Sequence, residues 1–144
     1  MNQVRVWVGA YIINSSWEIL LWTRISSHGK NTLCPPGWHL EFWETIEECA
    51  VREIQEETGW IYKINEVSII CTTNDIYKEE NRHYITLHTT LKYNWSKITI
   101  KEPDKMINWK WYSKQEIYDS MDFLFPSFRY FIQDETNAIK IWLT

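Results

Sequence analysis

The segment from Glu44 to Gly59 constrains the fold more than any other part of this sequence, because it predicts a helix that carries far more acid than base. Thr45 is suited to cap the helix N-terminus, and Glu48, three residues later, completes a capping box. Gly59 follows the last helical residue, where a left-handed residue commonly ends a helix. The helix is therefore predicted from Thr45 to about Thr58.

This segment holds six acidic residues and a single basic one, Arg52. At about 100° per residue, Glu53 and Glu57 continue the apolar stripe that begins at Ile46, and Glu56 lies on its shoulder. This stripe should face the protein, where carboxylates are costly unless something pairs with them. Hard divalent cations held by carboxylate oxygens are one solution. A surface or salt-bridged helix is the other, and spacing alone leaves both open.

The rest of the chain mixes strands and helices. Runs rich in β-branched and aromatic residues predict strands at residues 4–14, 18–24, 67–73, 83–93 and 108–112, with a short one at 98–100. Further helices are predicted at 113–120 and 126–133, and residues 26–36 read as a polar loop. With no repeat or linker, residues 1–144 are predicted to form one domain of the α/β or α+β class.

Composition and charge argue against several kinds of partner. A formal net charge of −4 gives no overall field that attracts nucleic-acid polymers or anionic membranes, so neither is expected to bind. No run approaches the roughly 18 apolar residues that span a bilayer, and the N-terminus lacks the apolar core of a signal peptide. The three cysteines, at positions 34, 49 and 71, form no metal-binding pair, which favours reduced thiols and a cytoplasmic protein.

Two blocks, residues 37–45 (GWHLEFWET) and 52–60 (REIQEETGW), closely resemble the Nudix box. That box runs G, five residues, E, seven residues, then R-E-U-x-E-E-x-G-U, where U is apolar. The match spans about residues 38–60; the elements from Glu44 onward fit, and only the leading glycine, at position 38, is replaced by Trp. Residues 36–48 are most similar to the MutT-like nucleoside-triphosphate diphosphatase branch. The resemblance implies the Nudix α/β/α sandwich around a mixed β-sheet.

The resemblance also implies a metal site and a reaction. Glu53, Glu56 and Glu57 would bind Mg²⁺ or Mn²⁺, and the backbone carbonyl of Gly37 would add a ligand. Water would attack a phosphorus of a nucleoside triphosphate, giving the monophosphate and pyrophosphate, with oxidised nucleotides of the 8-oxo-dGTP kind as one substrate class. Two alternatives stay open. One is hydrolysis of another nucleoside diphosphate linked to a group X, such as ADP-ribose. The other is a catalytically inactive Nudix module that binds nucleotide or protein.

Other site residues follow from the same resemblance. The implied catalytic set is Glu53, Arg52, Glu44 and Glu102. In this set Arg52 would orient a carboxylate, and Glu44 would support the junction of loop and helix through Arg52. Glu102 would be a further metal ligand or a base, unless it is an exposed loop acid. Nucleotide contacts are predicted for His39, Leu33, His83 and Tyr84, each with a packing or surface role as its alternative. A nucleotide is thus the expected partner, and a homodimer is left open.

The chain holds ten Trp but only four Gly, whereas an average chain of this length holds about ten Gly. Several Trp stand where the resemblance calls for glycine: Trp38 and Trp43 inside the box and Trp7, Trp17 and Trp22 outside it, with Trp60 and Trp95 as further candidates. Trp109 and Trp111 fit as genuine Trp. Since Trp at a positive φ should be strained, we hypothesise that the first five are glycines in the cell. Some genetic codes read UGA as glycine where another common code reads Trp. The alternative is a divergent domain with a blocked site.

Overall fold

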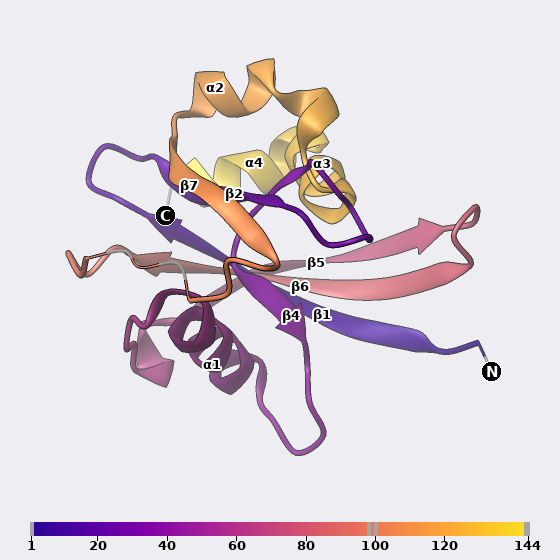
Figure 1. Cartoon of the computed structure of the whole chain (residues 1–144), viewed down its shortest axis with the longest axis horizontal. Coiled ribbons are helices and arrows are strands. Elements are labelled where there is room, and N and C mark those ends of the chain that lie inside the picture. The colour runs from indigo at the N-terminus through magenta and orange to yellow at the C-terminus, as the bar shows by residue number, and fades with distance from the viewer. Residues whose placement is uncertain (1, 98, 100, 143–144) are drawn as a thin grey trace.

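The computed structural model describes residues 2–97, 99 and 101–142, and Figure 1 shows them as a twisted β-sheet with helices on both sides. The strands are β1 (Val4–Ile13), β2 (Ile19–Arg24), β3 (Leu33–Cys34), β4 (Gly37–His39), β5 (Ser68–Tyr77), β6 (Arg82–Lys92) and β7 (Met106–Tyr112). The helices are α1 (Ile46–Thr58), α2 (Lys114–Asp119), α3 (Pro126–Gln133) and α4 (Glu135–Trp142). Two short 3₁₀ turns, η1 (Ile64–Glu66) and η2 (Met121–Phe123), complete the assignment.

The seven strands form one mixed sheet in the order β3-β2-β1-β6-β5, with β4 paired to β1 and β7 paired to β2. The central pair, β1 and β6, is parallel, and the other pairs are antiparallel. Because β1 pairs with β4 at Trp7–Gly9 and with β2 at Ile13, it lies at the middle of the sheet along its whole length. Strand β1 therefore anchors β4, the strand that precedes the loop to α1, in the sheet.

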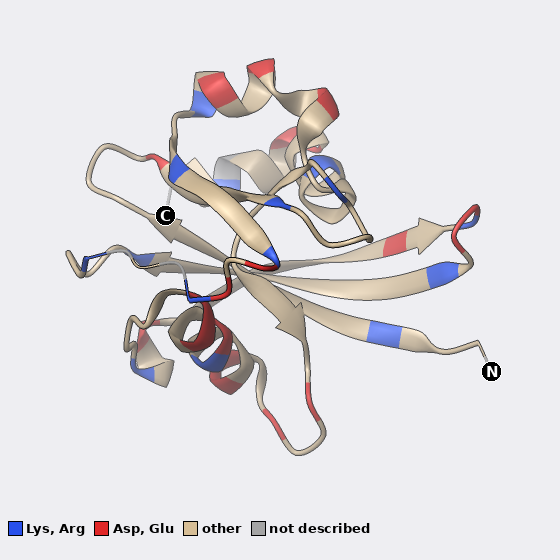
Figure 2. Cartoon of the chain, viewed as in Figure 1, with Lys and Arg blue, Asp and Glu red and all other residues tan. Residues whose placement is uncertain are grey.

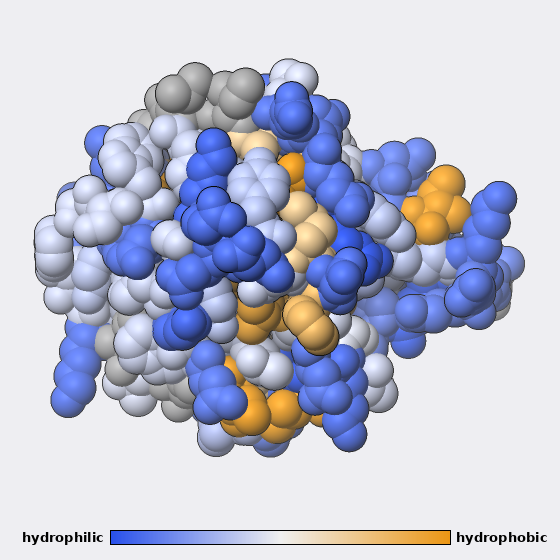
Figure 3. All heavy atoms as spheres, turned by 90° about the horizontal axis from the view of Figure 1, so that it is seen from above, coloured by the Kyte–Doolittle hydropathy of each residue, from blue (hydrophilic) through white to orange (hydrophobic). Residues whose placement is uncertain are grey.

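Helices cover both faces of the sheet. Helix α1 packs on one face with Ala50 and Ile54 in the core cluster that includes Val8 of β1. Helices α2, α3 and α4 lie on the opposite face (Figure 1), where Phe128 belongs to a second cluster with Tyr11. The predicted α/β/α sandwich around a mixed sheet is confirmed. Viewed from the α2 side, the surface is mostly hydrophilic with a narrow apolar strip (Figure 3), as expected of a covering layer.

Helix α1 begins and ends as the sequence predicts. The Thr45 hydroxyl accepts a hydrogen bond from the Glu48 amide at 3.1 Å, and the Glu48 carboxylate returns to the Thr45 amide at 3.4 Å. At the other end Gly59 is left-handed, with φ of 79°, and its amide donates to the Gln55 carbonyl at 2.9 Å. The capping box therefore fixes where the acidic helix starts relative to the loop before it.

The structure differs from the sequence-based expectation in three places. The loop predicted at 26–36 contains β3, and β4 follows at Gly37–His39; α4 was not predicted at all. Strands of two and three residues are too short to show a periodic pattern in the sequence. They form because they pair with β1 and β2, which lie earlier in the sequence. The strand predicted at 98–100 lies largely outside the described residues. All three thiols are free, and none of the described helices is long and apolar enough to cross a membrane.

Candidate active site

The acidic side chains of α1 differ sharply in exposure. Glu53 and Glu57 are 4% and 3% exposed, whereas the side chain of Glu56 is 52% exposed. This confirms the stripe that places the first two toward the protein and the third on its shoulder. Figure 2 shows acidic residues gathered on α1 and on the loop before it. Two carboxylates are thus buried, and their charge must be compensated by something near them.

Arg52 is the main cation that meets these acids. Its Nε lies 2.6 Å from Glu44 Oε2 and its Nη2 lies 3.0 Å from Glu44 Oε1, so the predicted contact is present and two-pronged. Nη1 donates to Glu53 at 2.5 Å and lies 3.4 Å from Glu56. Nη2 also donates to the carbonyl of His39 at 3.3 Å. One guanidinium therefore ties the preceding loop to the acidic face of α1, and its hydrogen bond lowers the pKa of Glu44.

The two buried acids are poorly compensated. Burial raises the pKa of Glu53 to about 7, although Arg52 lowers it. Burial raises the pKa of Glu57 well above its usual value, the charges of Glu53 and Glu102 add to this, and a backbone hydrogen bond from Gly37 opposes it. Glu57 Oε2 is buried and has no hydrogen-bond partner among the described residues. A buried carboxylate oxygen without a partner is costly, and a cation beside it would remove that cost.

These donors suit a hard divalent cation, although they are not already gathered around one point. Within the described part of the chain, no three acidic, His or Cys side chains form a ready metal site. Glu53 is hydrogen-bonded to Arg52, and Glu57 keeps an oxygen without a partner among the described residues. The chemistry of the set, carboxylate oxygens with two of them buried, fits Mg²⁺ or Mn²⁺.

Glu102 approaches the helix from the loop that precedes β7. Its side chain is 24% exposed and pairs with Lys105 Nζ at 2.7 Å. With Trp22 and Glu57 it lines a small hollow, in which the buried Trp22 Nε1 also has no partner among the described residues. The amide of Lys101 donates to the Glu57 carbonyl at 3.0 Å, which fixes this loop to the end of α1. Glu102 therefore lies beside the buried acids rather than as an isolated loop acid.

Gly37 brings its loop against β1 where a larger residue would not fit. It pairs with Gly9 across β1 and β4. A Cβ at Gly37 would overlap the carbonyl oxygen of Val8 and lie 3.0 Å from Gly9 Cα. Because the backbone of Gly37 lies so close to β1, it is also placed to make the hydrogen bond to Glu57 described above.

An aromatic cluster lies around β4, just before the loop that leads to α1. It consists of Trp7, Trp38, His39, Tyr84 and Phe125, whose neighbouring ring centroids are 5.2–5.8 Å apart. Burial and the nearby Arg5 lower the pKa of His39. The structure thus brings together two of the four predicted nucleotide contacts, His39 and Tyr84, from β4 and β6.

Sequence reasoning overlooked Arg24, which is 3% exposed. Its guanidinium lies 4.9 Å from the ring centre of Phe125 and 5.4 Å from that of Trp38. It donates to the His28 carbonyl at 3.0 Å, but no carboxylate of the described residues lies within ion-pair distance. A single Arg in the otherwise uncharged strand Ile19–Arg24 was the available signal. A buried cation without an acid is suited to meet an anionic ligand.

The comparison with known proteins decides the family. Residues 4–134 match the family described as NUDIX domain. The chain belongs to the Nudix family. Among relatives of this Nudix chain, an ADP-ribose pyrophosphatase of Methanocaldococcus jannaschii is 36% identical over 76 residues. That match covers 53% of this chain and only 44% of the relative, so the chain spans less than half of its length in this match.

Solved structures share the Nudix fold. A MutT protein from Methanosarcina mazei superposes with a TM-score of 0.79 at 24% identity, covering 94% of this chain and 96% of that one. A bifunctional NMN adenylyltransferase/ADP ribose pyrophosphatase from Francisella tularensis, complexed with AMP and a manganese ion, gives 0.69 at 24% identity. It covers 99% of this chain and 42% of the other. At these identities the likeness concerns the fold.

The other two predicted nucleotide contacts lie elsewhere. His83 neighbours Tyr84 on β6, so the two side chains point to opposite faces of the sheet. The His83 ring is hydrogen-bonded to Asn74 on β5. Leu33 lies on β3 and packs against the second core cluster, while its carbonyl accepts from the Phe125 amide at 2.7 Å.

The two Trp of the Nudix box have different backbones. Trp43 has a φ of 69°, as the strain argument anticipated, and is 90% exposed. Trp38 is absent from the positive-φ residues and sits in β4 opposite Val8, so the strain argument, which holds only for a positive φ, does not apply at this position. Pairing with β1 extends the chain there, which any residue accepts.

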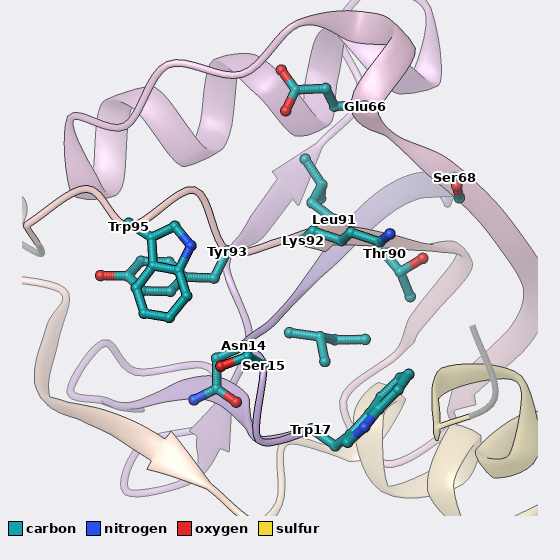
Figure 4. A pocket seen from close by; sticks show the side chains of 11 residues that line it. Asn14, Ser15, Trp17, Glu66, Ser68, Thr90, Leu91, Lys92, Tyr93 and Trp95 are labelled. Carbon is teal, nitrogen blue, oxygen red and sulfur yellow. The ribbon is translucent and has the colours of Figure 1, made fainter.

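A hollow of about 560 Å³, shown from close by in Figure 4, is lined by no residue of α1. Asn14, Trp17, Glu66, Tyr93 and Trp95 are among its lining residues. It adjoins the C-terminal end of β1, whereas β4, which precedes the loop that leads to α1, pairs with β1 at Trp7–Gly9. None of the predicted site residues lines it, so the candidate site is placed at the acids.

Proposed function

We propose that this Nudix chain is a pyrophosphohydrolase that cleaves a phosphoric anhydride bond in a nucleoside diphosphate linked to a further group. The observation that carries the proposal is the buried Glu57 oxygen without a partner, beside Glu53 and Glu102. Two buried carboxylates that repel each other destabilise a fold unless a cation compensates them. Their presence on a core-facing stripe therefore supports a functional site.

Glu53, Glu56 and Glu57 would hold Mg²⁺ or Mn²⁺, with the Gly37 carbonyl as a further ligand. When bound, the metal would polarise the diphosphate and lower the pKa of an attacking water. Glu102 is proposed as an additional ligand or as the base, since it is the acid that approaches from outside the helix.

Arg52 and Glu44 are proposed as positioning residues. Arg52 holds Glu53 at 2.5 Å and anchors itself on both oxygens of Glu44. This arrangement fixes the rotamer of Glu53 and the path of the loop before α1. Its contribution would be a pre-set orientation of the carboxylates, so that little reorganisation is needed when the substrate binds.

The aromatic cluster and Arg24 are proposed to meet the nucleotide. The partly exposed His39 ring offers a face for a base, the buried Tyr84 ring stacks against His39, and the buried Arg24 guanidinium, which pairs with no carboxylate of the described residues, adds positive charge behind the cluster. A nucleoside triphosphate, in which the further group is phosphate, is the specific substrate we propose first, on the similarity of residues 36–48 to MutT-like enzymes. ADP-ribose is the second candidate, because the relative from Methanocaldococcus jannaschii is named an ADP-ribose pyrophosphatase.

A substrate panel with Mg²⁺ tests the proposal. Purified protein should release pyrophosphate from nucleoside triphosphates, or AMP and ribose 5-phosphate from ADP-ribose, and Glu57→Gln should reduce turnover by about 100-fold or more. Glu47→Gln, on the first turn of the same helix, is the matched control and should retain activity. Mn²⁺ binding followed by electron paramagnetic resonance gives a second readout, which Glu57→Gln should weaken and Glu47→Gln should not.

Two results would reject the catalytic proposal. One is the absence of turnover with every nucleotide, with nucleotide binding intact, which would favour an inactive binding module. The other is unchanged turnover and Mn²⁺ binding in Glu57→Gln.

A further inference from the structure

Six non-glycine residues of the described chain have a positive φ, and they are of only two kinds. Three are Asn and three are Trp: Asn31, Asn81, Asn108, Trp17, Trp43 and Trp95. Asparagine is an ordinary occupant of the left-handed region, because its short side chain bonds locally. For a bulky residue the same region is a genuine outlier. The anomaly in this backbone is therefore confined to tryptophan.

Trp17 occupies the position of a β-hairpin that most requires glycine. The Trp17 amide donates to the Asn14 carbonyl at 3.0 Å, and the Asn14 amide donates to the Glu18 carbonyl at 3.0 Å. These bonds define a three-residue loop between β1 and β2, closed by a residue with φ of 61°. In such loops a type I turn is followed by a left-handed residue, normally glycine.

Trp43 lies in a second turn with its own requirement. The Glu44 amide donates to the Glu41 carbonyl at 3.1 Å, so residues 41–44 form a four-residue turn. Its third residue, Trp43, has a φ of 69°, whereas Phe42 is not among the positive-φ residues. This combination is that of a type II turn, which takes glycine at the third position.

Trp95 follows Asn94 in a third turn, with a φ of 64°. The Asn94 side chain accepts from the Ser96 amide at 3.2 Å, so the bend is held by asparagine and not by the indole. Asparagine followed by glycine is a pair typical of tight turns.

The three indole rings contribute little that would offset the strain. They are 49%, 90% and 74% exposed at positions 17, 43 and 95. Among the described residues, the Trp43 ring meets only that of its neighbour Phe42, edge-on, and the Trp95 ring meets only that of Tyr93, at a tilt, and none of the three indole N–H groups donates a hydrogen bond. By contrast Trp60, also weighed as a glycine candidate, is 2% exposed and donates to the Lys97 carbonyl at 2.9 Å.

We infer that positions 17, 43 and 95 are glycine in this protein as its own ribosomes make it, encoded by UGA. The backbone thus selects three positions by a criterion that is independent of any family pattern. The positive φ adds Trp95 to the positions that the sequence hypothesis already assigned to glycine. Trp7, Trp22 and Trp38, which that hypothesis also assigned to glycine, are not among the positive-φ residues. One consequence is visible in Figure 4: Trp17 and Trp95 line the same hollow, so glycine at both would open it into a shallow groove.

Thermal unfolding of three variants tests the inference without using turnover, so its failure is distinguishable from failure of the proposed function. The first carries Trp17→Gly, Trp43→Gly and Trp95→Gly, and the second carries Ala at the same positions. Both lose the same rings, but only glycine relieves the left-handed backbone. The glycine variant should therefore melt higher than the alanine variant, by on the order of 5 °C. Trp109→Gly, at a half-buried position of β7, is the control and should melt below the parent chain.

The gene gives the second test. UGA is expected at codons 17, 43 and 95 and UGG at codon 109, and mass spectrometry of the protein from its own cells should show glycine at the first three. UGG at codons 17, 43 or 95 overturns the inference. So does a glycine variant that melts no higher than the alanine variant.

Discussion

Arg52 holds both carboxylate oxygens of Glu44, with Nε 2.6 Å from Oε2 and Nη2 3.0 Å from Oε1. This fork leaves Nη1 free to hold Glu53 on the helix. The guanidinium thus uses one edge to fix the loop and the remaining nitrogen to fix a buried acid. A point charge would supply the attraction but not the two-pronged geometry.

Replacing Arg52 by Lys should therefore separate geometry from charge. We expect Arg52→Lys to lower kcat by about 10- to 100-fold, because Lys cannot hold Glu44 and Glu53 together. Steady-state kinetics with the best nucleotide of the panel measures this. Arg129→Lys, on α3, provides the control and should leave kcat unchanged. A fully active Arg52→Lys enzyme would show that the fork is not needed.

The buried acids predict an unusual dependence of stability on pH. The pKa of Glu53 is raised to about 7 and that of Glu57 is raised well above its usual value, so between about pH 4.5 and 7 the folded state binds more protons than the unfolded state. The free energy of unfolding contributed by these groups should therefore fall as pH rises through this window. In the presence of EDTA, the parent protein should have a lower Tm at pH 8 than at pH 5.5. This difference in Tm should be smaller in Glu53→Gln/Glu57→Gln. Mg²⁺ should restore Tm at pH 8 in the parent only. Identical pH profiles for the two proteins would contradict this account.

The capping box predicts a modest and local stability effect. Thr45→Ala removes the acceptor of the Glu48 amide at the start of α1 and should lower the free energy of unfolding by about 1 kcal/mol. Urea denaturation followed by circular dichroism measures it. Ser27→Ala, at an exposed bend without a side-chain hydrogen bond among those described, should change it by less than about 0.5 kcal/mol. Equal effects for the two substitutions would argue against the cap.

The three thiols should react slowly and unequally. Burial raises the pKa of Cys34 to about 12 and that of Cys71 to about 11, and it also raises the pKa of Cys49. Because the thiolate is the reactive form, we expect a disulfide reagent at pH 8 to modify Cys71, the half-buried one, first and the others only after unfolding. Mass spectrometry of partly modified protein identifies the site. Rapid modification of Cys34 in the native protein would show that this region opens.

The parts of the site that depend on local chemistry were predictable. Thr45, Glu48 and Gly59 signal the two ends of α1 within a few residues of sequence, and helical periodicity alone places Glu53 and Glu57 inward. The fold class followed from the order of elements and from the resemblance. These features need no knowledge of distant contacts, because capping and periodicity are properties of adjacent turns.

The parts that depend on distant contacts were not predictable. Strand β4 exists because Gly37 can lie against Gly9, and Arg24 stands out only by its position among the rings of Trp7, Trp38 and Phe125, which come from three other segments. His83 was chosen by residue type, whereas the alternation along β6 turns it away from Tyr84. The backbone conformations of Trp38 and Trp43 likewise differ because of pairing. Trp38 is extended because β4 pairs with β1, whereas Trp43 lies in a turn and has a positive φ.

The single hydrogen bond from the Lys101 amide to the Glu57 carbonyl, 3.0 Å long, gives the site a mechanical property. The last turn of α1 and the segment that carries Glu102 cannot move apart without breaking it. Fraying of that turn would therefore displace Glu102 as well, so this backbone hydrogen bond helps to hold the spacing of the Glu57 and Glu102 carboxylates. Slow amide hydrogen exchange at Lys101 would therefore report directly on how rigidly the acids are held in register.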